Sequence, residues 1–152
     1  MLFSGSFDHA IDEKGRVSIP ARFRDALLRE QCESLMITNS FSNGDKPCLQ
    51  LYTPSEWDRQ VIAPAQQKPQ FDPAFEEYLL FFIGMAHEVP LDRQGRILIP
   101  PKLREHARLE RDVTFTARGA YFQLWDKAIF EQVLAAAADK FKDPEFRRKL
   151  NL

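Results

Sequence analysis

The sequence predicts an α+β fold, a mostly β roll or small barrel built from two similar halves with flanking helices. The first observation is an internal repeat, because DEKGRVSIP at positions 12–20 recurs as DRQGRILIP at positions 92–100. The second observation is that short stretches of strand length alternate with helical patterns after each copy. One supersecondary unit used twice predicts two copies that face each other about a pseudo-two-fold axis.

The first half is expected to alternate strands and helices. Its expected elements are strands at 2–3, 7–11 and 17–19, a helix at 20–29, strands at 35–38 and 49–52, and a helix that begins at 54. A tight hairpin turn is expected to open at Asp12, whose carboxylate can accept nearby backbone amides, and to close at Gly15, which tolerates a positive φ. Thr53 and Glu56 predict a capping box, and a loop is expected around 39–47.

The second half repeats this order. Its expected elements are strands at 113–116 and 121–125, followed by a helix that Asp126 caps and that runs to about 141. Between the halves, the Pro- and Gln-rich stretch 63–70 predicts a linker, and Asp72-Pro73 begins a connecting helix. The predicted division is a first unit at 1–62, a linker and connecting helix at 63–80, a second unit at 81–141, and a C-terminal tail at 142–152.

Charge is distributed unevenly along the chain. The net charge is −1, but positions 12–24 carry four cations against two carboxylates, and positions 92–104 carry four against one. These two segments are therefore basic and the remainder of the chain is acidic. Segregation of this kind predicts a local anion-binding surface on an acidic body.

Eight cations of the two repeats are the candidate DNA-binding residues: Lys14, Arg16, Arg22, Arg24, Arg93, Arg96, Lys102 and Arg104. Cations at the start of a helix oppose its macrodipole, so an external anion explains them better than helix stability does. Phosphate is the obvious anion, and arginine can also bind guanine in the major groove through two hydrogen bonds. Asp12, Gly15, Asp92 and Gly95 are expected to hold the turns and orient the arginines.

Catalytic and cofactor motifs are missing from the sequence. The three histidines lie far apart without metal-ligand spacing, Cys32 and Cys48 form no CxxC motif, and there is neither a P-loop nor GxGxxG. The two aspartates do not match an aspartic protease dyad, because each has an arginine four positions later and no Asp-Thr/Ser-Gly motif. We therefore expect a non-enzymatic protein without metal, cofactor or small-molecule substrate. Without a secretory signal or a long apolar run, we expect it in the cytoplasm, away from membranes.

Both Asp-x-x-x-Arg elements are followed by Pro-x-x-x-Arg, and this doublet resembles the swapped-hairpin SpoVT-AbrB DNA-binding module. Two such modules in one chain resemble the MraZ family of bacterial transcriptional regulators. The segment CLQLY at 48–52, ahead of Glu56-Trp57, and its echo FQLWD at 122–126 carry the same resemblance. It extends from position 1 to about position 141.

The resemblance implies a nucleoid-associated regulator that binds short repeated boxes in double-stranded DNA. It further implies repression of the protein's own operon, within the division and cell-wall gene cluster, and a ring-like homo-oligomer with the motif arginines facing the DNA. One alternative stays open: an oligomeric protein-interaction scaffold, antitoxin-like or division-associated, without specific DNA binding. A steep salt dependence would favour DNA, because an apolar protein interface lacks it.

Overall fold

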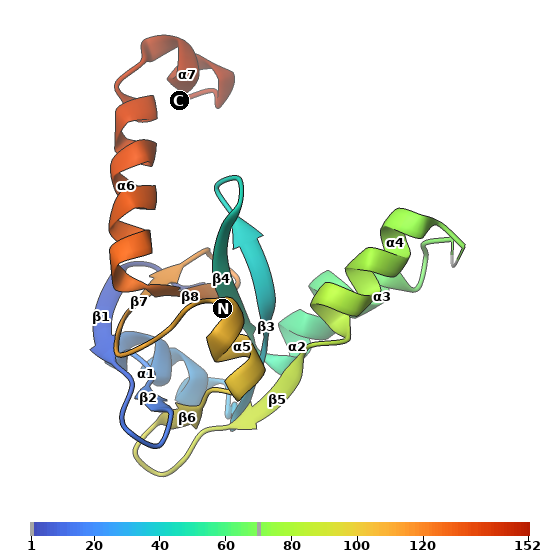
Figure 1. The fold of residues 1–152 in the computed structure, drawn as a ribbon, viewed down its shortest axis with the longest axis vertical. Helices are drawn as coiled ribbons and strands as arrows, with labels where there is room; N and C mark the ends of the chain where they lie inside the picture. Colours follow the sequence, from blue (N-terminus) through green and yellow to red (C-terminus); the bar gives the residue numbers. More distant parts are fainter. Residues whose placement is uncertain (1, 70) are drawn as a thin grey trace.

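The computed structural model describes residues 2–69 and 71–152, and it has an α+β fold dominated by antiparallel strands (Figure 1). The elements in the first half of the chain are β1 (Ser6–Ala10), β2 (Arg16–Ser18), α1 (Ala21–Arg29), β3 (Ser34–Ser42) and β4 (Lys46–Tyr52). The corresponding elements in the second half are β5 (His87–Pro90), β6 (Arg96–Leu98), α5 (Pro101–His106), β7 (Asp112–Ala117) and β8 (Phe122–Asp126). The α+β class predicted from the sequence is confirmed.

Strands of the two halves are interleaved in the main sheet. A six-stranded sheet has the order β1-β7-β8-β4-β3-β5, and β2 and β6 form a separate antiparallel pair. The first strand of each half therefore pairs with the other half, β1 with β7 and β5 with β3. The tight turn expected at Asp12 is present, because the Asp12 N–H donates to the Arg16 carbonyl at 2.9 Å and the Gly15 N–H donates to the Asp12 carbonyl at 3.0 Å. Beyond the turn, β1 and β2 belong to different sheets. This crossing lets Val17 and Ile97, which are paired across β2 and β6, become almost fully buried.

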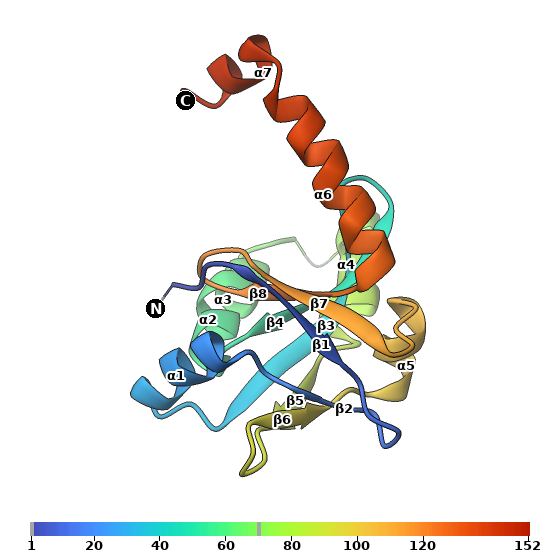
Figure 2. The ribbon, with the colours of Figure 1, turned by 90° about the vertical axis from the view of Figure 1, so that its left-hand side faces the viewer.

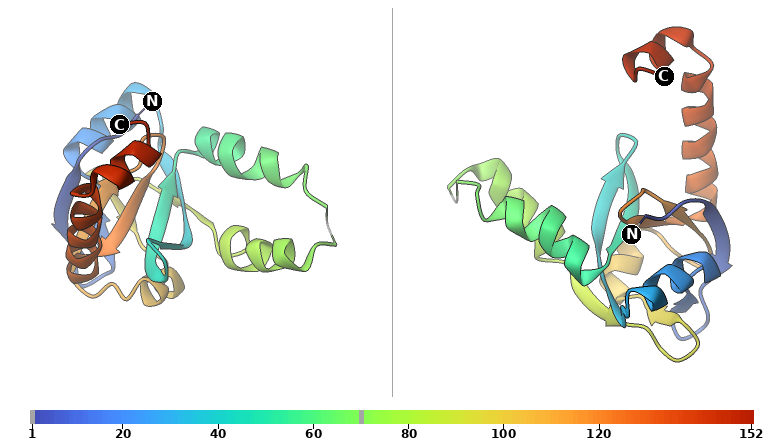
Figure 3. Two further views of the ribbon diagram at one scale, coloured as in Figure 1. Left: turned by 90° about the horizontal axis from the view of Figure 1, so that it is seen from above. Right: turned by 180° about the vertical axis from the view of Figure 1, so that it is seen from behind.

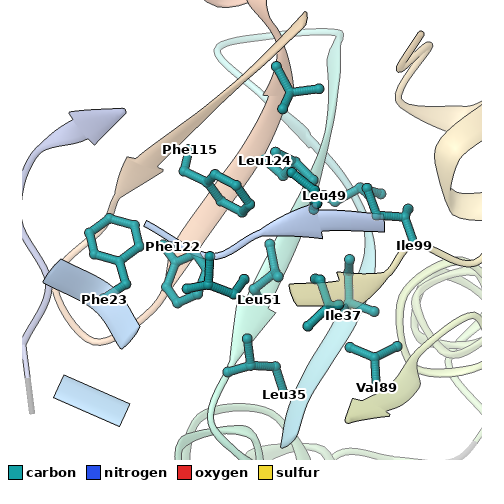
Figure 4. Close-up of a cluster of buried hydrophobic side chains, with 14 of the residues drawn as sticks. Phe23, Leu35, Ile37, Leu49, Leu51, Val89, Ile99, Phe115, Phe122 and Leu124 are labelled. Carbon is teal, nitrogen blue, oxygen red and sulfur yellow. The ribbon is translucent and has the colours of Figure 1, made fainter. Parts of the chain in front are cut away.

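The hydrophobic core lies between the main sheet and the β2–β6 pair (Figure 4). Both halves contribute fully buried side chains, among them Phe23, Leu35, Ile37, Leu49, Leu51, Ile99, Leu103, Phe115, Phe122 and Leu124. Phe23 of α1 packs against Phe122 of β8 with a centroid distance of 4.7 Å. Because one core serves both halves, their relative placement is fixed by burial.

A helical arm projects from the sheet and is defined as residues 54–83 (Figure 3). It consists of α2 (Pro54–Trp57), the π-helical segment η1 (Asp58–Ile62), α3 (Ala63–Ala65), α4 (Pro73–Tyr78) and the π-helical segment η2 (Leu79–Ile83). Trp57 stacks on Phe82 at 5.6 Å, so the two sides of the arm pack against each other. The apolar stripe predicted after Asp72 is present, since Tyr78 stacks on Phe82 at 5.2 Å.

Two expected boundaries differ from the structure. The predicted linker is helical through Ala65, and Gln70 lies outside the described residues. Pro64 is accommodated because the preceding turn is π-helical, which relaxes the hydrogen-bond register that proline interrupts. The loop expected at 39–47 is mostly strand, because β3 and β4 continue pairing up to a short turn at Asn43–Asp45.

The chain ends in two further helices, α6 (Lys127–Phe141) and α7 (Pro144–Lys149). As predicted, Asp126 caps α6, since its carboxylate accepts the Ile129 N–H at 3.0 Å. Only the first turns of α6 reach the body, through Phe130 and Val133. The rest of the helix extends away from the sheet (Figures 1 and 2). Among the residues described, no helix is both long and apolar enough to cross a bilayer.

Candidate nucleic-acid interface

The first turn is organised by Asp12. One carboxylate oxygen, Oδ1, accepts the backbone N–H of Lys14 and that of Arg16, both at 2.9 Å. The other, Oδ2, accepts Nε of Arg16 at 2.9 Å. Gly15 has a φ of +86°, the left-handed conformation that the sequence predicted for it. Backbone and guanidinium are thus fixed by a single carboxylate.

The second turn repeats this geometry at Asp92. Its Oδ1 accepts the N–H groups of Gln94 and Arg96 at 2.9 Å, and its Oδ2 accepts Nε of Arg96 at 2.8 Å. Gly95 has a φ of +75°. The repeat in the sequence is therefore a repeat in hydrogen bonding, and the Asp–Arg pairing predicted for both copies is present.

These contacts lower the pKa of both aspartates from the ordinary value. The largest effect on the pKa of Asp12 is the hydrogen bond from the backbone N–H of Arg16, which lowers it. Desolvation opposes this by raising the pKa, and hydrogen bonds from the Arg16 side chain and the Lys14 N–H lower it further. The pKa of Asp92 is lowered in the same order by Arg96 and Gln94. Both carboxylates are consequently ionised at neutral pH, where each holds the Nε side of its arginine.

The fold places the two turns at opposite ends of the β2–β6 pair. In the β2–β6 pair Arg16 lies opposite Leu98, and Arg96 lies opposite Ser18. The pair is closed at each end by a reciprocal bond, from the Ile19 N–H to the Gly95 carbonyl at 2.9 Å and from the Ile99 N–H to the Gly15 carbonyl at 3.0 Å. Figure 2 shows both turns at the end of the molecule that lies opposite α7.

The outer face of the β2–β6 pair therefore carries both motif arginines. Val17 and Ile97 point into the core, so the alternation of a strand directs Arg16 and Arg96 outward. About a third of each arginine side chain is exposed, 33% for Arg16 and 29% for Arg96. Leu98 shares this face and is 55% exposed. Guanidinium groups held in this way can donate to phosphates or to base edges.

The remaining predicted cations separate into two groups. Lys14 and Arg93 lie exposed at the tips of the turns, and Arg22 and Lys102 lie exposed on the first turns of α1 and α5. None of these four has an ion pair within residues 2–69 and 71–152.

Arg24 and Arg104 differ from those four because both are half-buried and hydrogen-bonded to backbone. Arg24 donates from Nη1 to the Gln94 carbonyl at 2.9 Å. Arg104 donates from Nε to the Leu109 carbonyl at 3.2 Å and from Nη2 to the Glu110 carbonyl at 2.6 Å. Their donors are partly used within the protein.

One cation near the site was not predicted. Exposed Arg111 lies beside the first turn, where its carbonyl accepts the Ile11 N–H at 2.8 Å. The matching position beside the second turn holds Glu33, whose carbonyl accepts the Leu91 N–H at 2.9 Å. Arg111 lies outside both repeated segments, so the repeat could not mark it. The two ends of the site consequently differ in charge.

Metal-binding geometry is not found in the described part of the chain. No group of three or more His, Cys, Asp or Glu side chains is placed there to hold an ion. An open hollow of about 500 Å³ lies beside the first turn, lined by residues that include Asp12, Arg104 and Arg111. Its lining is of mixed charge, because Glu13 and Glu110 also face it.

Comparison with known proteins extends the resemblance to nearly the whole chain. The model of the family described as "MraZ protein, putative antitoxin-like" matches residues 2–77 and 82–152. Three similar proteins are each named "Transcriptional regulator MraZ". The one from Syntrophobacter fumaroxidans is 35% identical over 140 residues, which are 92% of this chain and 89% of the relative.

The other two are somewhat more similar over a slightly shorter stretch. The Coxiella burnetii protein is 39% identical over 130 residues, covering 86% of this chain and 83% of its own length. The protein from a Thermoanaerobacter species is 37% identical over 131 residues, covering 86% and 85%. All three names denote regulators of transcription rather than enzymes.

Proposed function

The chain belongs to the MraZ family, and from this premise we propose that it is a sequence-specific DNA-binding regulator of transcription. It binds repeated boxes in its own promoter as a homo-oligomer and represses its own operon, in the division and cell-wall gene cluster. It acts at the nucleoid in the cytoplasm. The observation that carries the proposal is the pair of aspartate-oriented arginines on the outer face of the β2–β6 pair.

The geometry suits recognition of DNA because it prepares the arginines before binding. Asp12 and Asp92 hold Nε, which leaves the terminal nitrogens of Arg16 and Nη1 of Arg96 to contact base edges or phosphates, while Nη2 of Arg96 donates to Oε1 of Gln94 at 3.5 Å. The exposed cations Lys14, Arg22, Arg93 and Lys102 surround them and supply phosphate contacts. Phosphate contacts position the protein on the duplex, and base contacts then specify the sequence.

We also propose that the two halves form one pseudo-symmetric swapped-hairpin module. The exchange of β1 and β5 between the halves and the reciprocal bonds between Ile19 and Gly95 and between Ile99 and Gly15 support this arrangement. The proposed units are residues 1–62 and 81–141, joined by the linker and connecting helix at 63–80 and followed by the tail at 142–152. DNA is read by both units together.

A homo-oligomer is part of the mechanism. The two basic segments give a single chain few phosphate contacts, so one protomer binds weakly. Several protomers on spaced boxes gain about 10²–10⁴ in avidity from effective concentration. The helical arm of one protomer can contact the C-terminal helices of another, because the two carry opposite charge. The arm, residues 54–83, has five carboxylates and two cations, and residues 127–152 have six cations and four carboxylates. A contact between unlike surfaces of identical chains forms a ring when its rotation closes, and we propose such a ring here.

The first test measures binding to DNA by fluorescence anisotropy. Purified protein is titrated against its own upstream DNA and against scrambled DNA from about 50 to 200 mM salt. We expect specific, salt-sensitive binding, which Arg16→Ala and Arg96→Ala each weaken at least about tenfold. The fold of either variant should persist, because a partly exposed ion pair contributes little stability.

Arg29→Ala is the matched control. Arg29 is an exposed arginine in the last turn of α1, outside the arm and both turns, and its loss should leave DNA affinity unchanged. A folded, oligomeric wild-type protein that binds neither DNA would overturn the proposal and favour the interaction scaffold. A large loss of thermal stability in Arg16→Ala would instead assign that arginine a purely structural role.

A further inference from the structure

The side chain of Arg24 crosses from the first half of the molecule to the second turn. It belongs to α1, and its Nη1 donates to the carbonyl of Gln94 at 2.9 Å. The N–H of the same residue is held by Asp92 at 2.9 Å. Both backbone polar groups of Gln94 therefore have a side-chain partner.

The contact extends to Gly95. A Cβ atom added to this glycine would lie 2.3 Å from Cδ and 2.8 Å from Nη1 of Arg24. Glycine is therefore favoured here by its positive φ of +75°, and any Cβ at this position would displace the Arg24 side chain. The Arg24 side chain lies directly on the backbone that leads into Arg96.

The first turn lacks an equivalent contact. Arg104 occupies the matching position in the repeat, but the carbonyls of Leu109 and Glu110 take its Nε and Nη2 donors. A Cβ added to Gly15 would lie 3.5 Å from Nη1 of Arg104, an ordinary van der Waals distance. The Lys14 carbonyl has no side-chain donor among the described residues.

We propose that Arg24 is a positioning residue that fixes the second turn, and that the two turns are consequently unequal. The Arg24 side chain holds Gln94 and Gly95, and these hold the Asp92–Arg96 pair in place. Both turns hold their arginines before DNA binds, but the second has the additional Arg24 contact and is the more rigid of the two. The inference deepens the proposed function, and only its consequence for affinity rests on that function.

The first experiment needs no DNA. Hydrogen exchange is measured by mass spectrometry on peptides that cover each turn, in the wild type and in Arg24→Ala. We expect exchange to accelerate by about tenfold at Gln94, Gly95 and Arg96 and to stay unchanged in the first turn. Arg22→Ala removes a cation from the same helix without touching the turn, and it should change neither peptide.

A double-mutant cycle tests the close approach to Gly95. Gly95→Ala and Gly15→Ala share the strain of a positive φ, but only the first collides with an arginine. Gly95→Ala should therefore lower the melting temperature more than Gly15→Ala does. In an Arg24→Ala background that difference should disappear. Equal effects of the two glycine substitutions in the wild-type background would overturn the proposal.

DNA binding distinguishes positioning from phosphate contact. A lost phosphate contact lowers the slope of log affinity against log salt by about 0.9. Arg22→Ala should show that decrease, whereas Arg24→Ala should weaken binding at an unchanged slope. Arg24→Lys keeps one donor for the Gln94 carbonyl and should restore part of the affinity and of the exchange protection.

The opposite pattern would assign Arg24 to the phosphate backbone. A slope reduced by Arg24→Ala, together with unchanged exchange in the second turn, is the result that overturns the inference. Should the wild type bind no DNA, the proposed function fails, but the exchange and double-mutant measurements still decide whether Arg24 fixes the turn.

Discussion

At the scale of single residues, the two aspartates are the best-determined part of the site. The spacing of Asp12 and Arg16 predicted both the turn and the ion pair, because an Asp-initiated turn places positions i and i+4 within reach of each other. The different roles of Arg24 and Arg104 could not be predicted in this way. The acceptors of their side chains lie on other elements, so only the tertiary structure sets them apart.

The lowered pKa values of these aspartates predict an acid-sensitive fold. Because folding lowers the pKa of Asp12 and Asp92, their contribution to stability is present above the ordinary value of about 4 and is lost as the pH falls through the folded-state value. The melting temperature of the wild type should therefore fall more steeply below about pH 4 than that of the double variant Asp12→Asn/Asp92→Asn.

Calorimetry between about pH 2.5 and 7 measures this difference. Asp45→Asn, in the turn between β3 and β4, controls for the loss of a carboxylate elsewhere in the chain. If the melting temperatures of the wild type and the double variant fall in parallel as the pH is lowered, the turns do not hold their aspartates in the ionised form.

At the scale of elements, helix positions followed from local signals, whereas strand lengths did not. Thr53 and Asp126 accept the expected N-terminal amides of α2 and α6, because a cap is decided within a few residues. The sequence predicted a β3–β4 hairpin that is too short, because polar residues at its end are typical of a loop. Cross-strand pairing, from Ser40 with Cys48 to Ser42 with Lys46, extends both strands beyond their apolar residues.

The turn of this hairpin provides a direct test of that correction. Asn43 and Gly44 have φ values of +55° and +91°, as the Asn-Gly signal for a hairpin requires. Nothing lies within 4 Å of a Cβ added to Gly44. Gly44→Ala should therefore destabilise the protein by backbone strain alone, by about 1–2 kcal/mol.

Urea denaturation at equilibrium measures this cost. Asp45→Ala, the neighbouring substitution at an exposed position of negative φ, should change the free energy of unfolding by less than about 0.5 kcal/mol. A neutral Gly44→Ala would mean that the end of the hairpin is not held in this conformation in solution.

At the scale of the whole molecule, the repeat predicted two related halves but not how they interlock. Sequence similarity identifies the units, whereas the choice of partner strand depends on which pairing buries the core. Exchange of the first strands gives both Val17 and Ile97 complete burial and closes the β2–β6 pair with reciprocal bonds. The two motifs can then lie together although eighty positions separate them in the chain.

The proposed oligomer depends on surfaces that a single chain leaves open. Leu80 on the helical arm is 69% exposed, so a polar substitution there should cost the isolated chain little. If the arm packs against the basic C-terminal helices of another copy, Leu80→Glu removes apolar burial at that contact without reversing its charge. Light scattering should then show a smaller assembly, and affinity for DNA with several boxes should fall by up to about 10²–10⁴.

Two comparisons make this result specific to the arm. Affinity of Leu80→Glu for a single box should match that of the wild type, because one protomer keeps both turns intact. Leu28→Glu changes a leucine of similar exposure, 66%, at the far end of α1, and it should leave the assembly unchanged. An assembly of wild-type size in Leu80→Glu would place the contact elsewhere. If Leu80→Glu lowered the affinity for single-box and multiple-box DNA equally, the arm would affect DNA binding by distorting the turns rather than by joining protomers.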